Sequence, residues 1–336
     1  MPGYDNGRDA RCRDTITGET PVLLIMDNST LTRLVQPAFP GGTVTSSAPL
    51  DGMANSSYRV TLDGREAPVT VRVYTRAPES AAREWEIMAH VARRVPVPHI
   101  LWHGRNPELI DKPYAILRWV EGVPLDRVVA EGGPDAHQAA YAAGEALGRV
   151  GSFTFPKAGP LGPNLTIAEP WESFAQGIRQ CVEQCAFKGI AAERMGRDLA
   201  ARMWTFAMRN VGRLNRVRDS KCLVHADFHG RHLIMRRSRE EWTVGGVLDW
   251  EFAFSGPQLF DMGQMIRYKG LPPEYHDDFA RGFADHGGEL PEDWRTLGRT
   301  CDLVNLMQFL SRSELTPDME THWLNALRYS LDAEGV

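Results

Sequence analysis

The sequence lacks long apolar runs and any regular set of cysteines. Its 336 residues include only five scattered cysteines, with no Cys-x-x-Cys pair. Such a set predicts neither a disulfide framework nor a zinc site, and it indicates a reducing, cytoplasmic setting. No stretch reaches the length of a membrane-spanning helix, and the polar first residues do not resemble a signal peptide. We therefore expect a soluble protein with no membrane partner.

An excess of basic residues is also missing. Lysine and arginine number 38 against 43 aspartates and glutamates, which gives a formal net charge of -5. Nucleic acid is therefore not expected as a partner, because its recognition needs a basic face. The 43% hydrophobic and 24% charged residues are typical of a soluble globular enzyme. The length exceeds that of most single compact domains, which predicts two lobes.

The pattern of apolar residues changes near residue 120. Residues 1–28 are interpreted as an irregular N-terminal extension. Residues 29–120 show the alternation of β-strands around one main helix at 81–94, and residues 121–336 are mainly helical. Within the second part we expect three short apolar segments, at 222–225, 233–235 and 244–250. The polar stretch 236–242 would join the last two as a hairpin connection. The sequence thus predicts an α+β protein with a small antiparallel β lobe, a linking strand and a larger helical lobe.

Polar residues gather between the first two of these apolar segments. The stretch from His225 to His232 contains Asp227 and His229, and Asp249 ends the third apolar segment. Groups placed at strand ends are held rigidly, so we expect Asp227 and Asp249 to face one cleft. Two such carboxylates suit phosphoryl transfer, in which one accepts the proton of an attacking hydroxyl and the other binds Mg²⁺.

Residues 225–261 resemble the aminoglycoside phosphotransferase and choline kinase-like superfamily, which is related to protein kinases. The shared features are His-x-Asp at 225–227, Leu-Asp-Trp-Glu at 248–251 and Phe-Asp-Met at 260–262. The resemblance extends over residues 45–310 and is most specific over 222–263. It implies a bilobal protein kinase-like fold. The nucleotide-binding lobe and its linker strand would occupy 29–120, and the catalytic loop and substrate site 121–336.

The resemblance also implies roles for single residues. Asp227 matches the catalytic aspartate, His225 the histidine that braces its loop, and Asp249 the metal-binding aspartate. Asp261 matches an aspartate that holds the loop through backbone hydrogen bonds. His232 stands where the family has asparagine, the second magnesium ligand, and imidazole suits Mg²⁺ less well than an amide oxygen. An altered but working metal site, a site relying chiefly on Asp249, and a degenerate pseudoenzyme all stay open, with activity favoured.

Nucleotide contacts are implied in the small lobe. Arg72 matches the lysine that binds nucleotide phosphates, and Glu84 on the following helix matches its ion-pair partner. The turn over 51–57 would cover the phosphates through backbone N–H groups and the hydroxyls of Ser56 and Ser57. The backbone of the linker strand would bind the adenine edge at Arg118, Trp119 and Val120.

These expectations combine into one function. We expect an ATP- or GTP-dependent enzyme, with Mg²⁺, that transfers the γ-phosphate to a hydroxyl of a small molecule. An antibiotic of the aminoglycoside or a related type leads the acceptor classes, in resistance or self-protection. A metabolite kinase, a nucleotide-binding pseudokinase and a metal-dependent hydrolase are the alternatives, and the protein is expected as a monomer or homodimer. Four acidic residues could either attract a cationic acceptor or be solvated helix charges: Glu172, Asp277, Asp278 and Glu314.

Overall fold

The computed structural model describes residues 24–50, 55–239 and 241–336. Most of the expected N-terminal extension and of the phosphate-covering turn therefore lies outside the described residues. The first helix, α1 (Asn28–Val35), begins after Asp27, whose carboxylate accepts a hydrogen bond from the backbone N–H of Thr30. Side-chain capping of this kind satisfies a backbone donor that has no partner within the helix.

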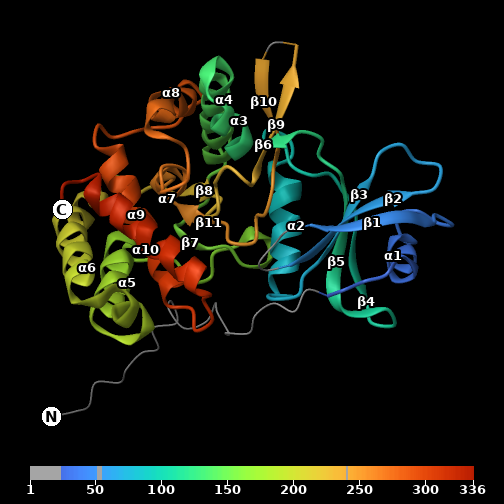
Figure 1. The fold of residues 1–336 in the computed structure, drawn as a ribbon, viewed down its shortest axis with the longest axis horizontal. Helices are drawn as coiled ribbons and strands as arrows, with labels where there is room; N and C mark the ends of the chain where they lie inside the picture. The colour runs from blue at the N-terminus through green and yellow to red at the C-terminus, as the bar shows by residue number, and fades with distance from the viewer. Residues whose placement is uncertain (1–23, 51–54, 240) are drawn as a thin grey trace.

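A five-stranded antiparallel sheet forms one end of the molecule (Figure 1). Its strand order is β1-β2-β3-β5-β4, with β1 at Val44–Leu50, β2 at Ser56–Leu62, β3 at Val69–Val73, β4 at Ile100–Asn106 and β5 at Ile110–Arg118. Leu31 and Leu34 of α1 pack with Val60 and Val71 in a core on one face of this sheet. The remaining helix of this part, α2 (Ser80–Val91), places Ile87 in the main core of the molecule.

The rest of the described chain is mainly helical. The helices are α3 (Leu125–Glu131), α4 (Gly133–Gly151), α5 (Phe174–Phe187), α6 (Gly189–Asn210), α7 (Leu259–Met265), α8 (His276–Asp285), α9 (Trp294–Leu310) and α10 (Pro317–Asp332). Two three-stranded sheets lie among them, with orders β10-β9-β6 and β7-β11-β8. Their strands are β6 (Val123–Pro124), β7 (Gly159–Pro160), β8 (Cys222–Val224), β9 (Leu233–Ser238), β10 (Glu241–Val247) and β11 (Phe254–Gly256). No helix among the described residues is both long and apolar enough to span a membrane.

The hairpin expected between the segments at 233–235 and 244–250 is confirmed, but its connection is shorter than 236–242, because most of that stretch is strand. β9 continues to Ser238 and β10 begins at Glu241, so the two strands form a longer ribbon. Arg236 and Arg237 are exposed on this ribbon, which is why its outer part carries no apolar alternation. The strand β4 was also missed, since Trp102 is followed by polar residues and a glycine rather than by alternating apolar side chains.

Candidate active site

The loop between β8 and β9 is held by a buried aspartate. The two carboxylate oxygens of Asp261 accept hydrogen bonds from the backbone N–H groups of His225 and Ala226, each at 2.8 Å. Gln264 donates to the carbonyl of Ala226 at 2.6 Å. Ala226 has a φ of +67°, an unfavourable value for a residue with a side chain, so these contacts offset local strain. The backbone role expected for Asp261 is confirmed.

His225 connects this loop to the strand that leads to the second aspartate. The backbone N–H of Asp227 donates to Nδ1 of His225 at 3.2 Å, so the ring proton is on Nε2, which donates to the carbonyl of Leu248 at 2.9 Å. Burial lowers the pKa of His225 to about 4. The imidazole is therefore neutral near pH 7, as this hydrogen-bond pattern requires.

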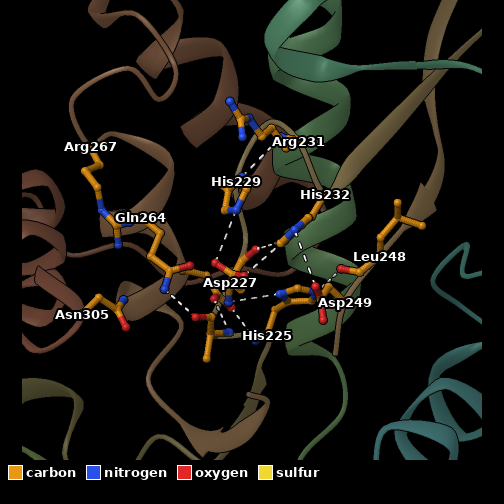
Figure 2. A network of polar contacts seen from close by, with 12 residues as sticks. His225, Asp227, His229, Arg231, His232, Leu248, Asp249, Gln264, Arg267 and Asn305 are labelled. Atoms are coloured by element: carbon orange, nitrogen blue, oxygen red, sulfur yellow. Dashed lines mark hydrogen bonds and ion pairs between the residues drawn. The ribbon is translucent and has the colours of Figure 1, made fainter. Parts of the chain in front are cut away.

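Two further histidines flank the carboxylate of Asp227 (Figure 2). Nε2 of His229 lies 3.4 Å from Oδ1, and Nδ1 of His232 lies 3.4 Å from Oδ2. Nδ1 of His232 is also 3.0 Å from the backbone carbonyl of Asp227. Burial raises the pKa of Asp227, but the charge of His232 and the contact with His229 lower it more, so that this pKa falls below its usual range. Asp227 is thus ionised.

His232 lies between the two aspartates. Its Nδ1 faces Asp227, while its Nε2 is 3.8 Å from Oδ2 of Asp249. Burial lowers the pKa of His232, but the two carboxylates more than compensate and raise it above the usual value. Among the described residues, donor atoms of Asp227, His229 and His232 lie within 4.8 Å of one another, close enough to share a metal ion. The three side chains therefore converge on one point beside the loop between β8 and β9.

Asp249, which contacts His232 on one side, contacts a residue of the five-stranded sheet on the other. Nη2 of Arg72 on β3 donates to Oδ1 of Asp249 at 2.7 Å and lies 3.5 Å from Oε2 of Glu84 on α2. Glu84 also accepts from the backbone N–H of Trp250 at 3.3 Å. Burial raises the pKa of Asp249, yet Arg72 and His232 lower it more, whereas burial keeps the pKa of Glu84 above its usual value. The sheet and the helical part therefore meet through buried charges at this aspartate.

One carboxylate near this junction, Glu251, was given no role of its own from the sequence. Oε2 of Glu251 accepts from Nδ2 of Asn55 at 3.0 Å, and its backbone carbonyl accepts from Arg83 at 2.6 Å. Burial, followed by the nearby charge of Asp249, raises the pKa of Glu251 to about 8. Its place at the end of the Leu-Asp-Trp-Glu motif, two residues after Asp249, was the signal available in the sequence. Glu251 adds a second polar link between the small sheet and the helical part.

The residues expected to contact the nucleotide differ in where their side chains and backbone groups point. Ser57 pairs with Arg72 across β2 and β3, so both side chains lie on the same face of the sheet. Ser56 lies on the opposite face, where its hydroxyl accepts from the backbone N–H of Leu24 at 2.9 Å. The N–H of Arg118 is used by the carbonyl of His99 at 2.8 Å. Trp119 and Val120 follow the end of β5 rather than belonging to it.

Comparison with known proteins gives one family and many structural neighbours. The model of a phosphotransferase enzyme family matches residues 46–298. An aminoglycoside phosphotransferase APH(4)-Ia, solved as a thermostable mutant with AMP-PNP and hygromycin B, is 17% identical with a TM-score of 0.64, over 91% of this chain and 99% of that one. The GDP and kanamycin complex of APH(2″)-IIIa is also 17% identical, with a TM-score of 0.68 over 91% and 99%. No curated protein matches the chain. At these identities the neighbours establish the fold.

Proposed function

Because the chain belongs to the phosphotransferase enzyme family, we propose that it transfers the γ-phosphate of ATP or GTP to a hydroxyl group of a small molecule. The main observation in support of this proposal is that Asp227 and Asp249 lie close together, on opposite sides of the His232 ring. One carboxylate is thereby available to the acceptor and the other to the nucleotide's metal ion. The bilobal protein kinase-like fold shared with the structural neighbours agrees with this division.

Asp227 is proposed to position the acceptor hydroxyl. Its low pKa makes it a weak base, so it orients the O–H group first and accepts the proton late, when the bond to the phosphorus has begun to form. His229 and His232 fix the direction of its two oxygens at 3.4 Å each. His225 acts on Asp227 through the backbone and is proposed as a positioning residue.

The nucleotide is proposed to bind between the small sheet and Asp249. Arg72 supplies the positive charge for the phosphates, with Glu84 holding its guanidinium. Ser57 is on the same face as Arg72 and is kept as a phosphate contact, whereas the orientation of Ser56 argues against that role. Since the Arg118 N–H is already used, adenine recognition is assigned to the backbone of Trp119 and Val120.

A divalent cation fits the donors at this point, although magnesium fits them only in part. Asp249 provides a carboxylate oxygen, which Mg²⁺ prefers, and Nε2 of His232 provides an imidazole nitrogen, which favours Mn²⁺ or Co²⁺. The Nδ1–H of His232 donates to the carbonyl of Asp227, as the second nitrogen of a metal-binding histidine usually does. A bound cation would neutralise charge on the nucleotide phosphates. Asp249 and His232 are therefore proposed as its protein ligands.

The acceptor class is the finer part of the proposal. An antibiotic of the aminoglycoside or a related type is the first candidate, since solved neighbours hold hygromycin B and kanamycin. A metabolite kinase is the second candidate, because the charges of Arg312 and Asp227 act on each other and a cation near Asp227 repels the several amines of an aminoglycoside. Arg267 does not add to this repulsion, since a buried ion pair with Asp302 neutralises it.

The proposed function is tested by incubating the protein with ATP or GTP and Mg²⁺ or Mn²⁺. The acceptor panel contains aminoglycosides, neutral antibiotics, sugars, amino alcohols and hydroxy acids. Release of ADP or GDP together with a product heavier by one phosphoryl group supports the proposal. Nucleotide binding without turnover for every acceptor would indicate a pseudokinase. Turnover of a substrate without any nucleotide would indicate the hydrolase suggested by the cluster of Asp227, His229 and His232.

A further inference from the structure

Three donor side chains of the loop between β8 and β9 lie close enough together to hold one metal ion (Figure 2). Nε2 of His229 is 3.4 Å from Oδ1 of Asp227, and Nδ1 of His232 is 3.4 Å from Oδ2. The centres of the two imidazole rings are 4.1 Å apart. Among the residues that the structure describes, this is the only group of three or more histidine, cysteine or acidic side chains whose donor atoms all lie within 4.8 Å of one another.

The backbone of the loop brings the two histidines together. The N–H of His232 donates to the carbonyl of His229 at 2.9 Å, which closes a turn and places side chains three residues apart side by side. Asp227 lies two residues before this turn, on the segment whose backbone Asp261 holds. Three donors on one braced loop need little further ordering to bind an ion, which lowers the entropic cost of binding.

The spacing of these donors fits a tetrahedral metal ion. Zn²⁺ binds imidazole nitrogen and carboxylate oxygen at about 2.0–2.2 Å, and tetrahedral ligands at that distance are about 3.3–3.5 Å apart. Both nitrogen–oxygen distances at Asp227 lie in this range, each to a different oxygen, so the carboxylate would bind through one oxygen or both. Two imidazoles and a carboxylate suit Zn²⁺ or Co²⁺, whereas Mg²⁺ prefers oxygen ligands alone.

Metal binding at this point moves the ring proton of His232. A metal-bound histidine carries its proton on the other ring nitrogen and commonly donates it to a carboxylate. With Nδ1 of His232 on the metal, Nε2–H points to Oδ2 of Asp249, which is 3.8 Å away, and the contact of Nδ1 with the carbonyl of Asp227 is given up. At His229 the metal takes Nε2, and the long 3.3 Å contact from the N–H of Arg231 to Nδ1 is lost.

The charges near the three donors leave Asp227 able to attract a cation. The nearby arginines that pair with carboxylates are Arg72 with Asp249 and Glu84, Arg231 with Asp126, and Arg267 with Asp302. The charge of Arg312 acts on Asp227 and opposes a bound cation. Arg312 makes no hydrogen bond or ion pair with this carboxylate among the described residues, so its effect is weaker than that of a metal bonded directly to it.

We propose that Asp227, His229 and His232 form a binding site for a transition-metal ion, with Zn²⁺ as the best match, and that this ion inhibits the enzyme. The bound ion would cover the carboxylate to which the acceptor hydroxyl is assigned. It would also withdraw His232 from the nucleotide's cation, because the proton is then on Nε2. The inhibition rests on the proposed function, whereas the metal site does not.

Metal binding is measured without nucleotide or acceptor. Untagged protein is freed of metal with a chelator and titrated with Co²⁺, whose visible absorption reports its coordination, and Zn²⁺ is then added. We expect one Co²⁺ per chain with the intense absorption of tetrahedral coordination, and loss of that absorption as Zn²⁺ takes the site. The absence of saturable absorption, or only the weak absorption of octahedral Co²⁺, would overturn the proposal.

Replacing His229 tests which side chains bind the ion. His229→Gln should weaken Zn²⁺ binding by more than about tenfold, since loss of a ligand costs at least as much as loss of the hydrogen-bond partner of a ligand. His99→Gln removes an exposed histidine between α2 and β4 and is the matched control, with an expected change of less than about twofold. Zn²⁺ should raise the melting temperature of the unmodified protein and the control, but not of His229→Gln. Equal affinity for Zn²⁺ in all three proteins would contradict the assigned ligands.

Inhibition is measured as phosphoryl transfer with Mg²⁺ or Mn²⁺ present and free Zn²⁺ fixed by a metal buffer. The unmodified protein and His99→Gln should lose activity at the same Zn²⁺ concentration, and a chelator should restore it. His229→Gln, compared with its own zinc-free rate, should need about tenfold more Zn²⁺ for half inhibition. Half inhibition at one concentration in all three proteins would assign the effect to zinc bound by the nucleotide and overturn the inhibitory role. Zinc binding by a protein that phosphorylates no acceptor would refute the proposed function while supporting the metal site.

Discussion

Arg72 donates a 2.7 Å hydrogen bond to Asp249 and is 3.5 Å from Glu84, so one guanidinium joins the candidate metal ligand to helix α2. Burial raises the pKa of both carboxylates, and this shared cation, followed by His232, keeps Asp249 ionised. The small sheet thereby sets the charge of a residue that belongs to the helical part. The strength of nucleotide binding should depend on this contact.

Replacing Arg72 tests that dependence. Arg72→Gln should lower kcat/KM for the nucleotide by about 10- to 100-fold, because it removes charged hydrogen bonds in a buried place. Arg72→Lys keeps the charge but has no planar head that reaches both carboxylates, so it should restore only part of the activity. Arg33→Gln on the exposed side of α1 is the control. An Arg72→Gln enzyme with unchanged nucleotide kinetics would remove Arg72 from the site.

His232→Asn tests the metal preference. Replacing an imidazole nitrogen by an amide oxygen should shift binding from Mn²⁺ toward Mg²⁺, by about tenfold in the ratio of the two affinities. Electron paramagnetic resonance of bound Mn²⁺, with Mg²⁺ as competitor and AMP-PNP present, measures this ratio without turnover. An unchanged ratio would show that His232 does not contact the metal. A large gain of activity in His232→Asn would show that the histidine is not already a competent ligand.

The free energy of unfolding should depend on pH partly through the protonation of His225. Its pKa is about 4 in the fold and near 6.5 in the unfolded chain, so the unfolded state binds more protons between these values. The free energy of unfolding should therefore fall as the pH is lowered through 6.5, with the loss complete near 4. Across this window the contribution is about 3 kcal/mol from a shift of this size.

Urea unfolding of the unmodified protein and His225→Gln at several pH values isolates this effect. Asp261 and Glu251, whose pKa values are raised to about 7 and about 8, stabilise the fold most at low pH and contribute in the opposite direction. Their effect is common to both proteins and cancels in the difference. Parallel curves for the two proteins would contradict the buried, neutral state of His225.

Replacing two different glycines by alanine should change stability in opposite directions. A Cβ added at Gly263 of α7 would lie 2.0 Å from the carbonyl oxygen of Gly298 on α9, so Gly263→Ala should destabilise by about 1–3 kcal/mol or more. Gly177 lies within α5 with no atom in the way of a Cβ, so Gly177→Ala should stabilise by about 0.5–1 kcal/mol. Thermal unfolding measures both, and the same sign for the two would contradict the close packing of α7 on α9.

The fold class could be predicted from the sequence because apolar periodicity and local motifs coincide. The sheet could be predicted from the apolar alternation in β2 and β3, and the loop from the apolar segments that flank His225 and Asp249. Strand β4 and the outer part of the β9–β10 ribbon could not be predicted, since exposed strands carry little apolar pattern.

Only the part of the candidate site that local sequence patterns indicate could be predicted. The pairing of Asp227 with Asp249 follows from strand ends. The contact between Arg72 and Asp249 joins residues 177 positions apart. Such a contact arises from tertiary packing, which no local pattern encodes. The face of β2 on which Ser56 lies depends on strand register, which the sequence does not show. The sequence therefore could not predict that the Ser56 hydroxyl binds the N–H of Leu24.

The most direct test of the account is phosphoryl transfer by Asp227→Asn, beside the unmodified protein and Asp219→Asn, an exposed control. With an acceptor identified from the panel, the unmodified protein and the control should form ADP or GDP and phosphorylated product in equal amounts. Asp227→Asn should lower kcat by about 10²- to 10⁴-fold, as expected for loss of a catalytic carboxylate, while its nucleotide affinity and melting temperature stay close to the parent's. Retention of kcat within a few-fold of the parent would contradict the assignment of Asp227, and with it the proposed active site.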